Sequence, residues 1–160
     1  MTRLHVPIKL RWSDLDAYGH VNNAAMLTLL EESRISVFWH GDLGVDGVNE
    51  SAGPATGPEG DTLTLIARQE VEYLAPIPYL REPLDVQLWI GRLGGASLDV
   101  CYEVCSPEGV EPFVVYARAQ SAIVLVDSKT LKPRRITDGE RELCVAHHCQ
   151  SHIEVPAFDR

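Results

Sequence analysis

Long apolar runs are missing from this sequence of 160 residues. No segment approaches the length needed to cross a bilayer, and the N-terminal residues alternate apolar and polar side chains instead of forming the continuous apolar core of a signal peptide. The sequence also has no internal repeat and no low-complexity tract. We therefore expect a cytoplasmic globular protein with no membrane association.

Positive charge is scarce as well. Fourteen Lys and Arg residues stand against 23 Asp and Glu residues, which gives a formal net charge of -9. Because such a chain repels phosphate backbones and anionic lipid surfaces, nucleic acid and membranes are excluded as expected partners. Cysteine is rare too, with four residues, and a cytosolic chain long enough to build its own core favours free thiols over disulfides.

The composition that remains is that of one ordinary domain, with 45% hydrophobic and 23% charged residues. Alternating apolar residues predict a strand over residues 4–10, in which Pro7 suits an edge position. Residues 24–39 have helix length and apolar residues around most of the circumference, which predicts a buried rather than a half-solvated helix. Residues 42–60, rich in Gly, predict a long loop.

Four further strands are predicted over residues 62–74, 83–91, 98–104 and 113–126, the last continuously apolar as a central strand would be. The expected order is thus a strand, one hydrophobic helix and a meander of four antiparallel strands. This pattern predicts an α+β fold in which a curved five-stranded antiparallel sheet wraps around one long helix. We expect this domain to cover residues 1–136, and residues 137–160 to form a C-terminal short helix and tail.

Chemistry-bearing residues concentrate in the connection between the first strand and the helix, Arg11 to Asn23, with the sequence RWSDLDAYGHVNN. A helix N-terminus presents unsatisfied N–H groups and the positive end of the helix dipole, where developing negative charge can be stabilised. The alternative is purely structural: Asn22 or Asn23 caps the helix, and Asp14 and Asp16 form turns.

The strings SDLDAYGHVNN and AAMLTLLEESR resemble the hot-dog-fold acyl-CoA thioesterases of the 4-hydroxybenzoyl-CoA thioesterase type, with their Asp-x-Asp-x-x-Gly-x-Val signature. They are also similar to the plant acyl-carrier-protein thioesterases. The resemblance covers about the first 40 residues, and the strands up to residue 136 match in layout. It implies the hot-dog fold and hydrolysis of an acyl-CoA thioester to a free acid and CoA, with no cofactor and no metal. It also implies a homodimer, or a tetramer of two dimers, with the pocket between subunits.

The same resemblance implies roles for the motif residues. Asp16 corresponds to the catalytic carboxylate, acting as nucleophile or as general base for water. The backbone N–H of Asn23 corresponds to the oxyanion donor, and Gly19 allows the thioester to approach the backbone. His20 either orients the water or acts as a base, or it only orients the loop. Asp14 is either a supporting residue or a direct participant.

Substrate binding is expected from Gly19, Asn22, Ser97 and Arg92. Ser97 follows the Gly94-Gly95 turn, where the family often carries a Ser facing CoA, although Ser also suits any hairpin. The CoA phosphates need local cations, and the Arg candidates for this role are Arg68, Arg81, Arg92, Arg118, Arg134 and Arg135. On the helix, Glu31 and Arg34 are expected to form an i,i+3 ion pair near a dimer contact.

Three alternatives compete with an acyl-CoA thioesterase. Cleavage from acyl carrier protein is disfavoured by repulsion between two acidic proteins, and a non-catalytic acyl-CoA-binding module would not need Asp16. A dehydratase is disfavoured because no His occurs between Asn23 and Trp39. Separately, Cys144, His148 and His152 have the i, i+4, i+8 spacing of metal ligands on a helix. The alternative is that they belong to a plain polar helix that binds no metal.

Overall fold

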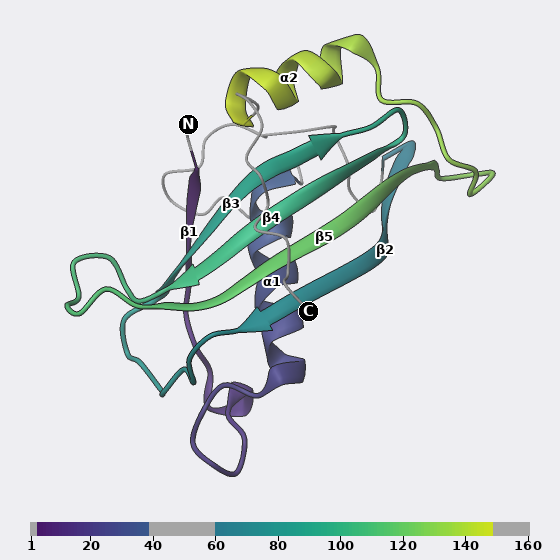
Figure 1. Ribbon diagram of the computed structural model, residues 1–160. Coiled ribbons are helices and arrows are strands. Elements are labelled where there is room, and N and C mark those ends of the chain that lie inside the picture. The colour runs from purple at the N-terminus through teal and green to yellow at the C-terminus, as the bar shows by residue number, and fades with distance from the viewer. Residues whose placement is uncertain (1–2, 39–59, 149–160) are drawn as a thin grey trace.

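A five-stranded antiparallel sheet with one long helix along its inner face forms the body of the molecule (Figure 1). The computed structural model describes residues 3–38 and 60–148. The elements in chain order are β1 (Leu4–Ile8), α1 (Asn23–Phe38), β2 (Thr62–Tyr73), β3 (Leu84–Leu93), β4 (Ser97–Cys105), β5 (Val115–Asp127) and α2 (Asp138–His148). This confirms the predicted fold class, with element bounds that differ from the predicted ones by a few residues. The predicted loop 42–60 lies outside the described residues except for its last residue.

The strand order corrects one prediction. The sheet runs β1-β3-β4-β5-β2, so β2 pairs with β5 at one edge instead of starting a four-stranded meander. The connection from β2 to β3, residues 74–83, contains three prolines (Pro76, Pro78 and Pro83). Proline lacks the N–H and the backbone freedom that a tight hairpin needs, and ten residues are enough to cross the roughly 15 Å between these strands. The chain therefore crosses the end of the sheet before it enters β3.

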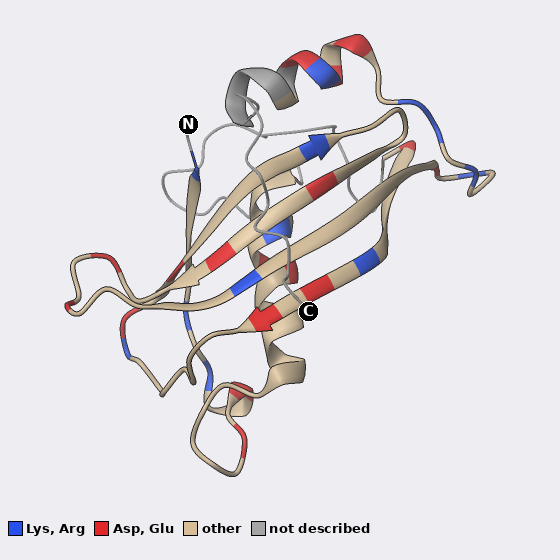
Figure 2. Ribbon diagram, in the orientation of Figure 1, with Lys and Arg blue, Asp and Glu red and all other residues tan. Residues whose placement is uncertain are grey.

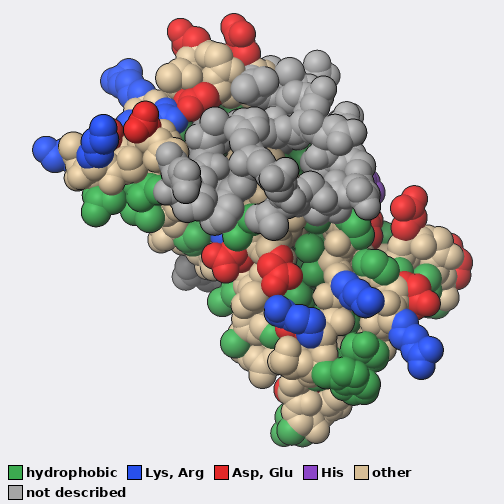
Figure 3. Space-filling view, turned by 180° about the vertical axis from the view of Figure 1, so that it is seen from behind, with side chains coloured by type: hydrophobic (Ala, Val, Ile, Leu, Met, Phe, Trp, Pro, Cys, Tyr) green, Lys and Arg blue, Asp and Glu red, His purple; other side chains and the backbone are tan. Residues whose placement is uncertain are grey.

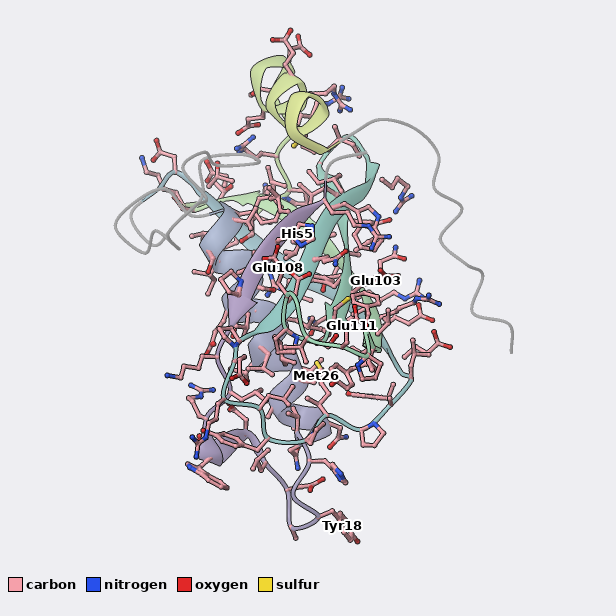
Figure 4. All side chains as sticks on the ribbon, turned by 90° about the vertical axis from the view of Figure 1, so that its left-hand side faces the viewer. His5, Tyr18, Met26, Glu103, Glu108 and Glu111 are labelled. Atoms are coloured by element: carbon pink, nitrogen blue, oxygen red, sulfur yellow. The ribbon has the colours of Figure 1, made fainter. Side chains whose placement is uncertain are left out.

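The core lies between α1 and the inward face of the sheet. Met26, Leu29 and Leu30 of the helix are at most 2% exposed, and they pack with alternate residues of the strands, such as Leu88 and Val104. Figure 4 shows Met26 between the helix and the sheet. Each fully buried side chain of this kind contributes roughly 1.5–3 kcal/mol to folding. The core is thus sufficient without cross-links, and Cys101 and Cys105 are free thiols.

The helix is less buried than its composition predicts. Leu27 is 40% exposed, and Ala24, Thr28 and Glu31 also lie at the surface, so the expectation of a fully buried helix is wrong for the single chain. The physical reason is that α1 packs mainly on β1 and β3. Figure 3, which looks onto the helix side of the molecule, shows hydrophobic side chains exposed between charged ones.

The C-terminal helix is fixed to the body of the protein. Thr137 and Glu140 cap its first turn reciprocally, each backbone N–H donating to the side chain of the other residue. Arg141 donates to the carbonyl oxygen of Gly94 at 2.8 Å, and Cys144 is fully buried in the core. The predicted short helix is therefore present over residues 138–148, and the predicted tail lies outside the described residues. Within the described ranges, no helix is long and apolar enough to span a membrane.

Candidate functional site

The connection from β1 to α1 begins with a turn held by a buried carboxylate. Asp14 is 2% exposed, and its carboxylate accepts hydrogen bonds from the Arg11 backbone N–H at 2.7 Å and from the Arg11 guanidinium at 2.9 Å. Burial works to raise the pKa of Asp14, but the hydrogen bonds and charge of Arg11 outweigh it and lower the pKa. Asp14 therefore stays ionised and anchors the turn, in keeping with the supporting role considered for it.

Residues 15–21 form a small hairpin after this turn. Leu15 and Val21 form an antiparallel bridge, and the Asp16 N–H donates to the His20 carbonyl oxygen at 2.8 Å. Gly19 has φ +77°, a left-handed conformation that L side chains rarely adopt. The turn thus accounts for the glycine of the motif. The predicted approach of a thioester to the Gly19 backbone is a separate matter and stays a prediction.

The Asp16 carboxylate is held by one of its two oxygens. Oδ1 accepts hydrogen bonds from the backbone N–H groups of Tyr18 at 2.8 Å and His20 at 3.2 Å. Oδ2 has no hydrogen-bond partner among the described residues. Asp16 is partly exposed, so the carboxylate combines a fixed orientation with one oxygen open to solvent or a ligand.

The start of α1 follows directly. Asn22 is the N-cap: its Oδ1 accepts from the Ala24 N–H at 2.8 Å, and its carbonyl oxygen accepts from the Met26 N–H at 3.0 Å. The Asn23 N–H donates no hydrogen bond within the described part of the chain, whereas the Asn23 carbonyl oxygen accepts from the Tyr73 hydroxyl at 3.1 Å. The first turn thus presents an unpaired donor at the positive end of the helix dipole.

Residues 74–83 support this hairpin from the other side. The Val21 N–H donates to the Ile77 carbonyl oxygen at 2.9 Å, and His20 forms a backbone bridge with Pro78. Trp12 and Tyr79 stack with ring centroids 4.5 Å apart. These supports and Tyr73 were not identified from the sequence, because nothing in the spacing shows that the crossover returns to this loop.

The side chains of Tyr18 and His20 take different positions in the hairpin. Figure 4 shows Tyr18 at the tip of the hairpin, pointing away from the body of the protein, and its side chain is 85% exposed. The His20 side chain is partly exposed and makes no hydrogen bond to any described residue. The structure thus places Asp16, Gly19, His20, Asn22 and Asn23 together in one short segment.

Ser97 and Arg92 lie elsewhere. They flank the β3–β4 hairpin, which contacts α2, while the connection from β1 to α1 lies at the opposite end of the sheet (Figure 1). Arg92 pairs with Asp99 at 2.9 Å. Within one chain, the structure does not bring these two predicted substrate-binding residues to the motif.

The six Arg residues predicted as candidates for binding the CoA phosphates differ in whether they already form a salt bridge. Four of the six pair with a carboxylate within 3.1 Å or less: Arg68 with Glu70, Arg92 with Asp99, Arg118 with Glu103 and Arg134 with Glu140. Arg81 and Arg135 have no ion pair within the described residues. Arg81 belongs to the 74–83 crossover beside the motif, whereas Arg135 lies in the basic connection between β5 and α2 at the other end (Figure 2).

The predicted ion pair between Glu31 and Arg34 is wrong. Glu31 is exposed, but Arg34 turns inward, where its guanidinium donates to the Tyr102 hydroxyl at 3.1 Å. The physical reason is the position of Arg34 on the helix face that packs towards the sheet, together with Ser33 and Val37. Glu32, rather than Glu31, pairs with an Arg, at 3.4 Å from Arg11.

Cys101 and Cys105 are buried and do not provide a reactive thiolate. Burial raises the pKa of Cys101 and of Cys105 to about 11, so both thiols are protonated near neutral pH. Of the predicted cluster of Cys144, His148 and His152, only the Cys144 side chain is described. The described residues contain no group of three metal-ligating side chains.

The sequence is similar to that of known proteins. Residues 10–144 match the family model described as the thioesterase-like superfamily. The chain is also 30% identical over 136 residues to the uncharacterized protein YsmA of Bacillus subtilis strain 168, covering 84% of this chain and 80% of that protein.

Solved structures of thioesterases are also similar to this chain. A thioesterase from Thermus thermophilus, complexed with coenzyme A and Zn, superposes with a TM-score of 0.64 at 27% identity, covering 89% of this chain and 92% of that chain. A candidate acyl-CoA thioesterase from Xanthomonas campestris superposes with a TM-score of 0.59 at 30% identity, covering 79% and 95%. These neighbours confirm the hot-dog fold predicted from the sequence.

Proposed function

The chain belongs to the thioesterase-like superfamily, and on this premise we propose that it hydrolyses an acyl-CoA thioester to a free carboxylic acid and CoA. The observation that carries the proposal is the pairing of two groups in residues 15–23. One is the Asp16 carboxylate, whose Oδ2 is bonded to no described residue, and the other is the Asn23 N–H at the start of α1, which is likewise unpaired in the described chain.

In the proposed reaction, Asp16 Oδ2 acts on the thioester in one of two ways. As a general base it takes a proton from water, whose oxygen attacks the carbonyl carbon. As a nucleophile it forms a mixed anhydride that water then hydrolyses. In both routes the bond from the carbonyl carbon to sulfur breaks, CoA leaves as the thiolate and is protonated, and one water is consumed.

The carbonyl oxygen gains negative charge when the carbon is attacked. We assign its stabilisation to the Asn23 N–H and to the positive end of the α1 dipole. Asn22 fixes this first turn by capping it, and Gly19 permits the tight hairpin that presents Asp16. His20, whose backbone N–H holds Asp16 Oδ1, is assigned the orientation of the attacking water.

CoA carries phosphates, and Arg81 is the cation we assign to them. Its side chain is exposed, it has no ion pair in the described chain, and it belongs to the crossover that contacts the hairpin. The overall charge of -9 favours CoA over acidic acyl carrier protein as the carrier of the acyl group.

We further propose that the working unit is a homodimer formed at the β2 edge. β2 is a strand of twelve residues whose outer edge pairs with no described strand, and its consecutive residues Leu65, Ile66 and Ala67 are exposed. A long, apolar and exposed edge strand is a template for pairing with another chain. Ser97 and Arg92 would contribute to binding CoA only from a second copy, because each chain holds them away from its own motif.

The test is release of free thiol from a panel of short, long and aromatic acyl-CoAs by the wild type and by Asp16→Asn. Asn keeps an oxygen that accepts the Tyr18 and His20 N–H groups, so the hairpin should remain folded while the reacting carboxylate is lost. We expect kcat to fall by about two orders of magnitude or more. Asp61→Asn, an exposed Asp outside the site, is the matched control.

Unchanged turnover in Asp16→Asn would remove Asp16 from the mechanism. No turnover of any acyl-CoA by the wild type, together with saturable binding of CoA esters, would show an acyl-CoA-binding module instead. Turnover of acyl carrier protein substrates alone would show that the carrier is misassigned.

A further inference from the structure

A buried cation that pairs with no described carboxylate lies on the inward side of α1. Arg34 is 9% exposed, and its only hydrogen bond among the described residues is to the hydroxyl of Tyr102, which is 1% exposed. None of the salt bridges within the described chain includes Arg34. A guanidinium largely removed from water is costly unless an anion compensates it, so this arrangement is incomplete among the described residues.

Arg34 ends a line of polar side chains that crosses an otherwise apolar face. Ser121 on β5 is 1% exposed and lies on the same inward face of the strand as the core residues Ala119 and Ile123. Gln69, its register partner on the edge strand β2, donates from Nε2 to Ser121 Oγ at 3.2 Å. We call Gln69, Ser121, Tyr102 and Arg34 the polar row. Its members come from β2, β5, β4 and α1, so it reaches from the edge of the sheet to the helix.

The polar row has hydrogen-bond donors to spare. Arg34 carries five N–H donors in a fork that matches the two oxygens of a carboxylate, and one protein hydrogen bond is formed. Burial raises the pKa of Tyr102, although Arg34 opposes the shift, so the phenol keeps its proton and can donate it. Among the described residues, only Trp89 Nε1 is fully buried without a partner. The remaining Arg34 nitrogens therefore reach accessible space.

The polar row is placed to contact the far end of a substrate. Arg34 follows Asn23 by eleven residues, which is about three helical turns, so both lie on the same side of α1. On this side the Asn23 carbonyl oxygen accepts from Tyr73 of β2. The rise along the axis is roughly 16 Å, and the Arg side chain leans back towards the helix N-terminus, which shortens the gap.

Resting on the proposed thioesterase function, we propose that the polar row binds a carboxylate at the far end of the acyl group. The substrates are then CoA monothioesters of medium-chain dicarboxylic acids. Each bond of an extended chain advances about 1.2 Å, so a distance of 16 Å allows at most roughly 13 bonds. The Arg34 side chain leans towards the helix N-terminus and shortens this distance, so an acyl group of about ten carbons fits. The Arg34 fork and the Tyr102 hydroxyl donate to the terminal carboxylate while the thioester carbonyl lies at Asn23.

The experiment compares two acyl groups of equal length, decanoyl and 9-carboxynonanoyl. Affinities of their non-hydrolysable thioether CoA analogues are measured by titration calorimetry, and kcat/KM is measured on the two thioesters. The proteins are wild type, Arg34→Met, Tyr102→Phe and Arg118→Met. Arg118 lies on the opposite face of the sheet from Ala117 and Ala119, so Arg118→Met is the matched control. Thermal unfolding is recorded for each protein.

We expect the wild type to prefer the carboxylated group by about ten- to a hundredfold in both measurements, as a charge-assisted pair should. Arg34→Met should bring this ratio close to one, Tyr102→Phe should reduce it in part, and Arg118→Met should keep it. Arg34→Met should also unfold at the same or a higher temperature than wild type, because an uncompensated buried charge is removed.

Equal affinity of the wild type for the two analogues would overturn the inference, even if Arg34→Met fails to fold. A preference that survives in Arg34→Met, with a large loss of stability, would show that Arg34 is only structural. These results are separate from the proposed function. An inactive wild type that still binds the carboxylated analogue more tightly would support carboxylate binding by the polar row and refute the thioesterase activity. Active hydrolysis without a preference between the two acyl groups would support the thioesterase activity and refute carboxylate binding.

Discussion

Substitution of Asp14 by Asn separates the support of the candidate site from its chemistry. Asp14 is 2% exposed and receives the Arg11 backbone N–H at 2.7 Å, its Nε at 3.2 Å and its terminal nitrogen at 2.9 Å. Asn keeps an acceptor for the backbone N–H and loses the charge that faces the guanidinium. Hydrogen bonds to charged groups contribute roughly 1.5–3 kcal/mol, and the Arg11 side chain is 54% exposed, so the lower value of about 1.5 kcal/mol is expected.

For a chain of this length, a loss of this size lowers Tm by about 3–6 °C near neutral pH. The pH dependence has a definite sign. Because the folded state lowers the pKa of Asp14 below its unfolded value, its stabilisation is present above about pH 4 and is lost as pH falls through the folded pKa. The difference in Tm between wild type and Asp14→Asn should therefore shrink below about pH 4.

The assay is thermal unfolding followed by circular dichroism over a series of pH values, with Asp61→Asn as an exposed control. Equal Tm values near neutral pH would refute the account of Asp14 as an anchor. A difference that persists unchanged below about pH 4 would attribute the loss to packing rather than to charge.

Two further predictions concern the hairpin and the sheet edge. Gly19→Ala, at φ +77°, should cost about 1 kcal/mol of unfolding free energy and lower kcat through a displaced Asp16, as measured by urea unfolding and thiol release; unchanged values of both would show that the turn tolerates a side chain. Ile66→Asp on the exposed β2 edge should shift the protein from dimer to monomer in light scattering after gel filtration, whereas a dimer that persists would place the interface elsewhere.

Most of the elements could be predicted from the sequence because their signals are local. Alternation predicts β3 and β4, a continuous apolar run predicts β5, and Asn22 with its following apolar residues predicts the start of α1. The position of β2 could not be predicted, because strand pairing depends on the path of the connection and not on the strand itself. Three prolines in residues 74–83 were the available sign that no tight hairpin follows β2.

The candidate site also has a part that could be predicted from the sequence and a part that could not. The resemblance placed Asp16, His20 and Asn23 in one segment, and the structure describes them within one hairpin and one helix start. The inward turn of Arg34 was missed, because its spacing from Glu31 fits a surface ion pair equally well. Only the three-dimensional position of Tyr102, 68 residues later in the chain, distinguishes the two arrangements.

The crossover from β2 to β3 also determines when the site can form. The motif is synthesised early, but the groups that hold it, the Tyr73 hydroxyl and the Ile77 carbonyl oxygen, are added fifty or more residues after the residues they bind. Among the described strands, β2, which carries Tyr73, pairs with β5, the last of them along the chain. Loop-closure entropy therefore has to be overcome across most of the chain before the hairpin is held in place. Tyr18 and His20 orient the Asp16 carboxylate locally, but Val21 and Asn23 gain these two contacts only once β2 and the crossover are in place. A chain truncated before β5 therefore carries the motif without the supports that fix it against the sheet.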